Sequence, residues 1–283
     1  MIPSNIAPDA DTLLVGAGQG SLHVERYGTG GRPVVLLHGL GTSSFLWRDV
    51  APRLAADGYS AYALDLLGHG ESDRPLEADY SIAAQATCVE RVLSSLRLPS
   101  AALVGIDMGG GVAQRLASTK GGLVTHLALI NSVGLDECPA GDVASLQRDT
   151  ARYALRVSRG LLGAAPLIQG LLEGSVADRV HMPARLVARY LAPYAGSDGV
   201  THLLKLARAV DAEDVEDLPL GNIRAPTLII WGEEDRWLDS GLAERLHGSI
   251  PGSQLVRLPG VARLVPEEAP DTLTQLLLEL LKR

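Results

Sequence analysis

Short apolar runs bounded by glycine or proline recur along the chain, and such runs are typical of buried β-strands. Eight of them predict strands, at residues 12–16, 21–28, 33–39, 59–68, 101–106, 125–133, 226–232 and 253–260. The first two are expected to form a hairpin. Apolar residues at helical spacing lie between most of the others, notably in 43–58, 81–96, 240–250 and 270–283. Alternation of strand and helix predicts an α/β fold whose mostly parallel sheet is covered on both faces.

One interval breaks this alternation. Residues 135–218 show helical periodicity with polar breaks and no convincing strand. We therefore expect a core domain made of residues 1–134 and 219–283, with 135–218 inserted as a helical lid. Ligands bind at the carboxyl ends of the strands in open α/β sheets, so the lid is expected to cover the site.

Composition narrows the class of protein. The 283 residues are 46% hydrophobic with a mean hydropathy of +0.14, enough to bury a large core. The net charge is −8 and the basic residues are scattered, which argues against nucleic acid or an anionic membrane as a partner. Cys88 and Cys138 are far apart, which disfavours a disulfide framework, and no zinc-ligand spacing occurs. We expect a cytoplasmic protein without metal, cofactor, signal peptide or membrane span.

Five sequence blocks carry the chemistry. They are LLHGLGTSSFLW (36–47), DLLGHGESDRP (65–75), VGIDMGGGVAQ (104–114), WGEEDRWLD (231–239) and LPGVARLVPEEAP (258–270). Their order and spacing resemble the α/β-hydrolase superfamily, in particular its esterase-like branch, and the resemblance covers nearly the whole chain. It implies an eight-stranded α/β-hydrolase fold with a helical lid.

The resemblance also implies roles for particular residues. In this superfamily a Gly-x-Ser-x-Gly turn between strand and helix holds the nucleophile. Gly105, Gly109 and Gly110 would supply the small residues of that turn. The backbone amides of Leu40 and Met108 would form the oxyanion hole.

Two positions depart from the family pattern. Asp107 stands where the esterases have serine, and Arg263 stands where they have the catalytic histidine, while Asp235 matches the family's acid. An arginine cannot accept a proton at neutral pH, so a Ser-His-Asp mechanism is excluded. If the family geometry holds, Arg263 lies between Asp107 and Asp235, and the site carries a charge of about −1.

Another histidine could replace the missing base. His181 and His202 lie in the predicted lid and are the candidates that could reach the site. His38 is expected to be a structural residue of the oxyanion loop. The other histidines are expected to lie too far from Asp107; they are His23, His69, His126 and His247.

Three hypotheses remain for Asp107. It could be a general acid or base in an elimination, cyclisation or isomerisation of a carbonyl-bearing substrate, as in non-hydrolytic family members, often of bacterial natural-product biosynthesis. It could be a nucleophile, as in the epoxide hydrolases and haloalkane dehalogenases of the superfamily. The chain could also be an inactive ligand-binding protein in which Arg263 is an ion-pair partner. The first is the favoured hypothesis, and the retained elbow glycines and His38-Gly39 loop argue against the third.

The pocket is expected to be apolar because the lid contains runs such as LLGAAPLIQGLL. A small hydrophobic organic substrate follows from this, but neither its identity nor the oligomeric state does. Candidate pocket residues are His38, Trp47, Tyr153, Tyr190, Tyr194 and Trp237.

Overall fold

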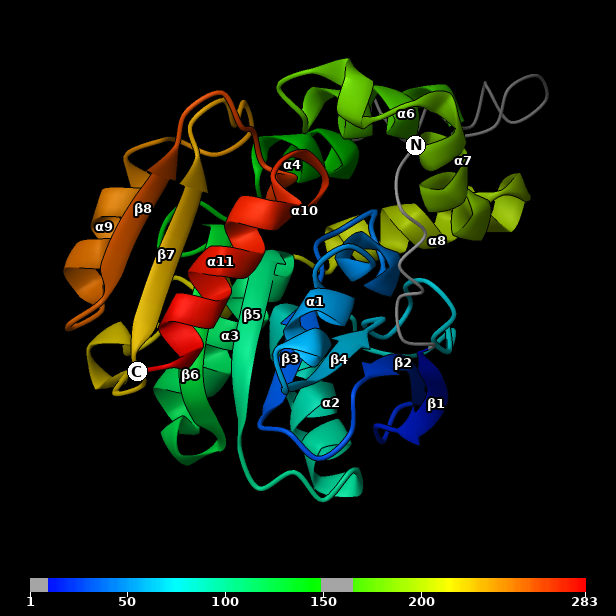
Figure 1. Ribbon diagram of the computed structural model, residues 1–283. Helices are drawn as coiled ribbons and strands as arrows, with labels where there is room; N and C mark the ends of the chain where they lie inside the picture. Colours follow the sequence, from blue (N-terminus) through cyan, green and yellow to red (C-terminus); the bar gives the residue numbers. More distant parts are fainter. Residues whose placement is uncertain (1–9, 149–164) are drawn as a thin grey trace, which may run out of the picture.

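The sheet of the computed structural model, which describes residues 10–148 and 165–283, has eight strands in the order β1-β2-β4-β3-β5-β6-β7-β8 (Figure 1). A strand occurs at each of the eight predicted positions. Their bounds are Asp11–Gly16 (β1), Ser21–Tyr27 (β2), Pro33–Leu37 (β3), Ser60–Leu64 (β4), Ala101–Asp107 (β5), Val124–Ser132 (β6), Thr227–Gly232 (β7) and Gln254–Leu258 (β8).

The predicted hairpin and the mostly parallel sheet are both confirmed. β1 and β2 pair antiparallel, β2 pairs antiparallel with β4, and all further pairings are parallel. β3 ends at Leu37, two residues earlier than predicted, because His38 and Gly39 leave the sheet and begin a loop. The carboxyl ends of the parallel strands therefore lie along one edge, where their loops meet.

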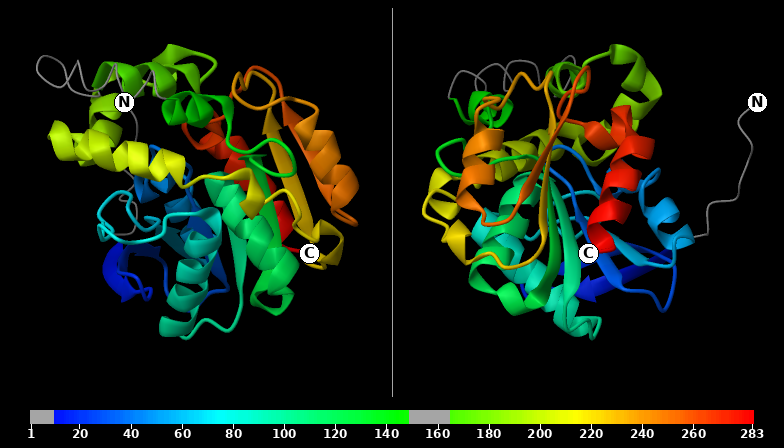
Figure 2. Two further views of the ribbon diagram at one scale, coloured as in Figure 1. Left: turned by 180° about the vertical axis from the view of Figure 1, so that it is seen from behind. Right: turned by 60° about the vertical axis from the view of Figure 1, so that its left-hand side comes forward.

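Helices cover both faces of the sheet (Figure 2). One layer holds α1 and α11, and the opposite layer holds α2, α3 and α9. Ser81 caps the helix predicted after it, since its side chain accepts a hydrogen bond from the Ala84 amide. The bounds are Ala51–Ala56 (α1), Ile82–Ser95 (α2), Met108–Thr119 (α3), Leu242–Ser249 (α9), Val265–Glu268 (α10) and Pro270–Leu281 (α11), with 3₁₀ turns at Ser44–Trp47 (η1) and Gly121–Leu123 (η2).

The helices α4, α6, α7 and α8, which follow β6, lie over the carboxyl ends of the strands (Figure 1). Within the predicted lid the structure describes 135–148 and 165–218, and these segments are helical. The elements between the two strands are Gly141–Gln147 (α4), Ala165–Gly174 (α6), Arg179–His181 (η3), Ala184–Leu191 (α7), Ala192–Tyr194 (η4), Gly196–Arg208 (α8), Ala212–Asp214 (η5) and Leu220–Asn222 (η6).

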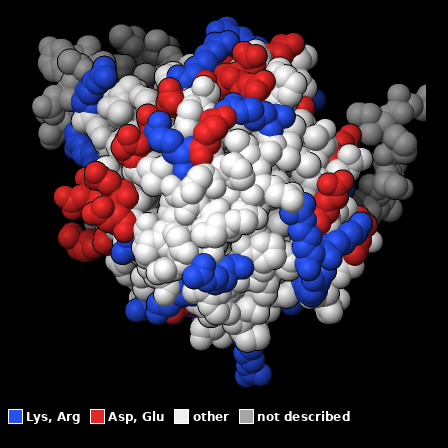
Figure 3. Space-filling model, turned by 90° about the vertical axis from the view of Figure 1, so that its left-hand side faces the viewer, with Lys and Arg blue, Asp and Glu red and all other residues white. Residues whose placement is uncertain are grey.

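Charged side chains are spread around the surface. Figure 3 shows the face that carries β8 and α11: uncharged groups occupy its centre and charges of both signs surround it. Within 10–148 and 165–283, no helix combines the length and apolar character needed to cross a bilayer. The central strands β4 and β5 are buried along their whole length, so the sheet forms the core on which the site rests.

Candidate active site

Asp107 lies at the sharp turn between β5 and α3. Its backbone has φ 52° and ψ −123°, a region that residues with a side chain rarely adopt. Strain of this kind costs about 1–3 kcal/mol and persists only where the surrounding structure enforces it. The turn directs the carboxylate away from the sheet, and the residue is 4% exposed.

The glycines around this turn are needed because the backbone packs closely there. A Cβ at Gly105 would lie 2.3 Å from the Gly109 carbonyl oxygen, and one at Gly109 would lie 2.5 Å from the His38 carbonyl oxygen. A Cβ at Gly110 would lie 2.0 Å from the Ser132 hydroxyl oxygen. None of the three positions has room for a side chain, which agrees with the small residues expected at this turn.

The backbone amides that were expected to form an oxyanion hole donate to Asp107 itself. The Leu40 amide lies 3.2 Å from Oδ2, and the Met108 amide also favours the ionised carboxylate. Gly39 permits this approach, because a Cβ there would lie 2.6 Å from Oδ2. Oδ1 is buried and has no hydrogen-bond partner within the described residues.

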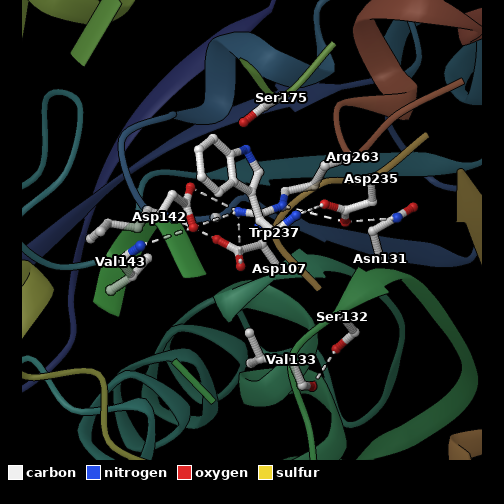
Figure 4. A network of polar contacts seen from close by, with 12 residues as sticks. Asp107, Asn131, Ser132, Val133, Asp142, Val143, Ser175, Asp235, Trp237 and Arg263 are labelled. Carbon is white, nitrogen blue, oxygen red and sulfur yellow. Dashed lines mark hydrogen bonds and ion pairs between the residues drawn. The ribbon is translucent and has the colours of Figure 1, made fainter. Parts of the chain in front are cut away.

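Arg263, on the loop after β8, contacts three carboxylates (Figure 4). Its Nη1 lies 3.7 Å from Asp107 Oδ1, and its Nε lies 3.5 Å from Asp235 Oδ2. The shortest contacts are those from Nη1 to Asp142, at 3.1 and 3.0 Å. Asp142 belongs to the first turn of α4, so a lid residue supplies the closest partner of this guanidinium.

Asp235 is held by the core. Its Oδ2 accepts a hydrogen bond from Asn131 Nδ2 at 2.9 Å, and its Oδ1 accepts one from the Trp237 amide at 2.9 Å. Asn131 also has a positive φ, 35°, and exchanges hydrogen bonds with the backbone of Gly232. Both oxygens of the Asp235 carboxylate therefore accept a hydrogen bond from a group other than Arg263.

The charge of the site is more negative than the sequence indicated. The three carboxylates of Asp107, Asp142 and Asp235 around one guanidinium give a formal net charge of −2, whereas the two expected from the sequence would give −1. Burial raises the pKa of Asp107 to about 6; Arg263 opposes this shift and Asp142 adds to it. The side chain of Arg263 is 4% exposed and its flanking carboxylates raise its pKa further, so it stays protonated. Asp107 is thus the group here that titrates close to neutrality.

The space beside Asp107 is small. Its cavity has a volume of about 20 Å³, which is room for a water molecule and no more. None of the described residues that line it is a histidine. They are Gly39, Leu40, Thr42, Ile106, Asp107, Leu172, Ser175, Arg263 and Leu264.

His38 is placed as a structural residue and does not line this cavity. The Leu66 amide donates to its Nε2 at 3.0 Å, so Nδ1 carries the proton and donates to the Gly39 carbonyl at 2.8 Å. Burial lowers its pKa and keeps the ring neutral. The lid histidines lie elsewhere: His202 bonds to the Gly68 carbonyl oxygen, and His181 lines a separate cleft.

The aromatic residues predicted to line the pocket mostly lie away from it. Trp47 is completely buried in the core, and the Tyr190 hydroxyl donates to Glu267. Tyr194 is buried, and it is not among the residues that line the cavity. Tyr153 falls outside the described residues. Trp237 is half-buried beside the Arg263 network and contributes its backbone amide to Asp235 (Figure 4).

Asp142 and Asn131 are site residues that were not predicted from the sequence. Asp142 follows a polar break and stands in the first turn of a helix, where an aspartate is usual because it complements the helix dipole. Nothing in the local pattern distinguishes it from a surface residue.

Within the part of the chain that the structure describes, no group of histidine, cysteine or acidic residues is arranged to hold a metal ion.

Comparison with known families shows to which family the chain belongs. The model of the alpha/beta hydrolase fold family matches residues 32–270, most of the chain. The protein belongs to the α/β-hydrolase family. Among curated α/β-hydrolases, the uncharacterized hydrolase YugF of Bacillus subtilis is 28% identical over 93% of this chain and 94% of its own length. A haloalkane dehalogenase of Mycobacterium marinum is 33% identical over 79% of this chain and 75% of its own.

Solved α/β-hydrolase structures share the fold. The epoxide hydrolase CorEH superimposes with a TM-score of 0.84 at 19% identity, covering 97% of this chain and 99% of that one. Haloalkane dehalogenase DbeA of Bradyrhizobium elkani gives 0.75 at 23% identity, covering 97% and 99%. At these identities the likeness concerns the fold alone.

Proposed function

We propose that this α/β-hydrolase catalyses a non-hydrolytic elimination, cyclisation or isomerisation of a small hydrophobic, carbonyl-bearing substrate, with Asp107 transferring the proton. One observation carries the proposal: Oδ1 of Asp107 is buried at the cavity without a hydrogen-bond partner, in a carboxyl group whose pKa is raised to about 6. A general acid or base works best when its pKa lies near the working pH.

Arg263 fits this role and does not fit hydrolysis. Because a guanidinium keeps its protons, it cannot activate water as the family's histidine does. It can stabilise negative charge that develops on a substrate oxygen. Its Nη2 has no hydrogen-bond partner within the described residues, so a donor remains for that oxygen.

Substrate binding requires more space than the present cavity offers. Leu172 and Ser175 of the lid face Gly39 and Leu40 of the core across the cavity of about 20 Å³. We expect the lid to move away from the core when a substrate enters, as in other enzymes that close over their ligands.

The free, buried cysteines fit a cytoplasmic setting, and natural-product biosynthesis is the pathway class we favour.

Proton exchange in D₂O tests the proposal. A panel of hydrophobic ketones and enones is incubated with the protein, and deuterium incorporation next to the carbonyl is followed by NMR. Asp107→Asn should slow any exchange that the wild type supports by roughly 10²–10⁴-fold. Exchange that is equal in wild type and Asp107→Asn would refute the assignment. Cleavage of p-nitrophenyl esters should stay at background, and esterase turnover lost in Asp107→Ala would equally contradict it.

A second candidate function is favoured by the haloalkane dehalogenase at 33% identity. In it, an oxygen of Asp107 attacks carbon and displaces a halide or opens an epoxide, which leaves an ester on the protein. Without a base to activate water the ester would persist. Intact-mass measurement after incubation with 1-bromobutane or styrene oxide should then show an adduct that Asp107→Asn lacks. An unmodified wild type would exclude this candidate.

A further inference from the structure

A second, larger cleft lies where the lid meets the core. Its volume is about 510 Å³, and it shares no lining residue with the cavity beside Asp107. Phe45 and Arg48, at η1, form the core side, and residues of η3 and α7 form the lid side. This volume is within the range of small-molecule sites.

A buried ion pair neutralises the acidic group of the cleft. Arg48 donates to both oxygens of Glu267, at 2.7 and 2.6 Å, and the Tyr190 hydroxyl donates to the same carboxylate at 2.5 Å. The carboxylate side chain is 2% exposed. Glu267 is therefore occupied, and its charge is compensated before any ligand arrives.

Two further arginines of the cleft are not neutralised. Arg185 and Arg189 are four residues apart on α7, so they lie on the same side of that helix. Both are exposed, and neither forms an ion pair with a carboxylate in the described part of the chain. The guanidinium of Arg189 lies 5.4 Å from the centre of the Phe45 ring, and that of Arg48 lies 4.4 Å from it.

Apart from His181, the remaining lining is apolar. Phe45, Pro183 and Leu186 line the cleft, and Val180 at its edge is 69% exposed. Three arginines and one glutamate leave the cleft positive, although the whole chain carries −8. A ligand that suits both features has an apolar body and one anionic group.

The geometry points to a binding site for an organic anion, a carboxylate or phosphate on an apolar body, in the cleft formed by Phe45, Arg185, Leu186 and Arg189. The apolar body packs on Phe45 and Leu186. The anionic group accepts hydrogen bonds from Arg185 and Arg189, whose planar guanidinium groups match both carboxylate and phosphate oxygens. This inference does not depend on the role of Asp107.

Fluorescence titration of the full chain tests it. The anionic probe 8-anilinonaphthalene-1-sulfonate is compared with the neutral N-phenyl-1-naphthylamine. In the double variant Arg185→Gln/Arg189→Gln, affinity for the anionic probe should fall about 10- to 100-fold, the usual effect of losing hydrogen bonds to a charged group. Affinity for the neutral probe should change less than twofold.

The matched control is Arg208→Gln/Arg224→Gln, which removes the same charge from exposed positions outside the cleft. It should bind both probes as the wild type does, and equal losses in the two double variants would overturn the site. Displacement of the anionic probe by octanoate or by octyl phosphate shows whether the site binds a carboxylate or a phosphate. Displacement by octanol at equal concentration would overturn the requirement for an anion. Circular dichroism confirms that each variant is folded.

Discussion

Asp142→Asn isolates the electrostatic coupling between the lid and Asp107. Oδ1 of Asp107 and Oδ2 of Asp142 lie 3.7 and 3.0 Å from the same nitrogen of Arg263, so they are at most about 6.7 Å apart. At an effective dielectric constant of about 20, two unit charges at that separation repel by about 2.5 kcal/mol. Loss of this repulsion should lower the pKa of Asp107 by about 1.8 units.

The change appears in how stability depends on pH. The pKa of Asp107 is about 6 in the folded protein, above the ordinary aspartate value of about 3.9. The folded state therefore binds the proton more tightly. The free energy of unfolding of the wild type should fall by about 3 kcal/mol from this group as pH rises from below about 4 to above about 6. Most of that fall should be absent in Asp142→Asn.

Urea unfolding at intervals between pH 4 and 7 measures this difference. The lost hydrogen bond to Arg263 lowers the stability of the variant by a roughly constant amount. Its stability relative to the wild type should nevertheless rise by about 2 kcal/mol across the interval. In an Asp107→Asn background the same substitution should show no such rise. Parallel curves for wild type and Asp142→Asn would refute the coupling.

Three further substitutions probe the same end of the sheet. Gly39→Ala brings a Cβ to 2.6 Å from the Asp107 carboxylate and should destabilise the fold by about 1–3 kcal/mol in urea unfolding; an unchanged midpoint would show that the loop can shift. Burial raises the pKa of Asp65, but hydrogen bonds, led by the one from His23, lower it to about 2 overall. Asp65→Asn should therefore lower the free energy of unfolding by about 2–3 kcal/mol at pH 7, and by progressively less as pH falls from about 4 to 2. Arg263→Lys should lower stability by about 1–3 kcal/mol, because an ammonium group cannot match the spread of the three carboxylates; a melting temperature equal to that of the wild type would contradict this.

The fold could be predicted from the sequence because each strand carries its own signal. An apolar run such as 101–106, ended by glycines, predicts a buried strand without knowledge of its neighbours. The elbow at Asp107 was also predictable, since the close backbone approach there requires glycine at 105, 109 and 110.

The partners of Arg263 were only partly predictable. Asp107 and Asp235 follow strands whose place in the sheet the family pattern implied. Asp142 approaches through the packing of α4 against the core, which no local pattern encodes. For the same reason the small volume beside Asp107 and the burial of Trp47 could not be derived, because both depend on how side chains distant in sequence pack.

The lid carboxylate Asp142 would hinder a histidine base at position 263. A histidine introduced by Arg263→His would meet the same three acidic side chains that now surround the guanidinium. Their negative charge would favour the imidazolium form, and a protonated imidazole cannot take a proton from water or serine. Exchange of Asp107 and Arg263 alone would still leave Asp142 and Asp235 to favour the protonated form of the new histidine. A route to ester hydrolysis has to alter the inserted segment at Asp142 together with Asp107 and Arg263, so lid and core are bound to change in step.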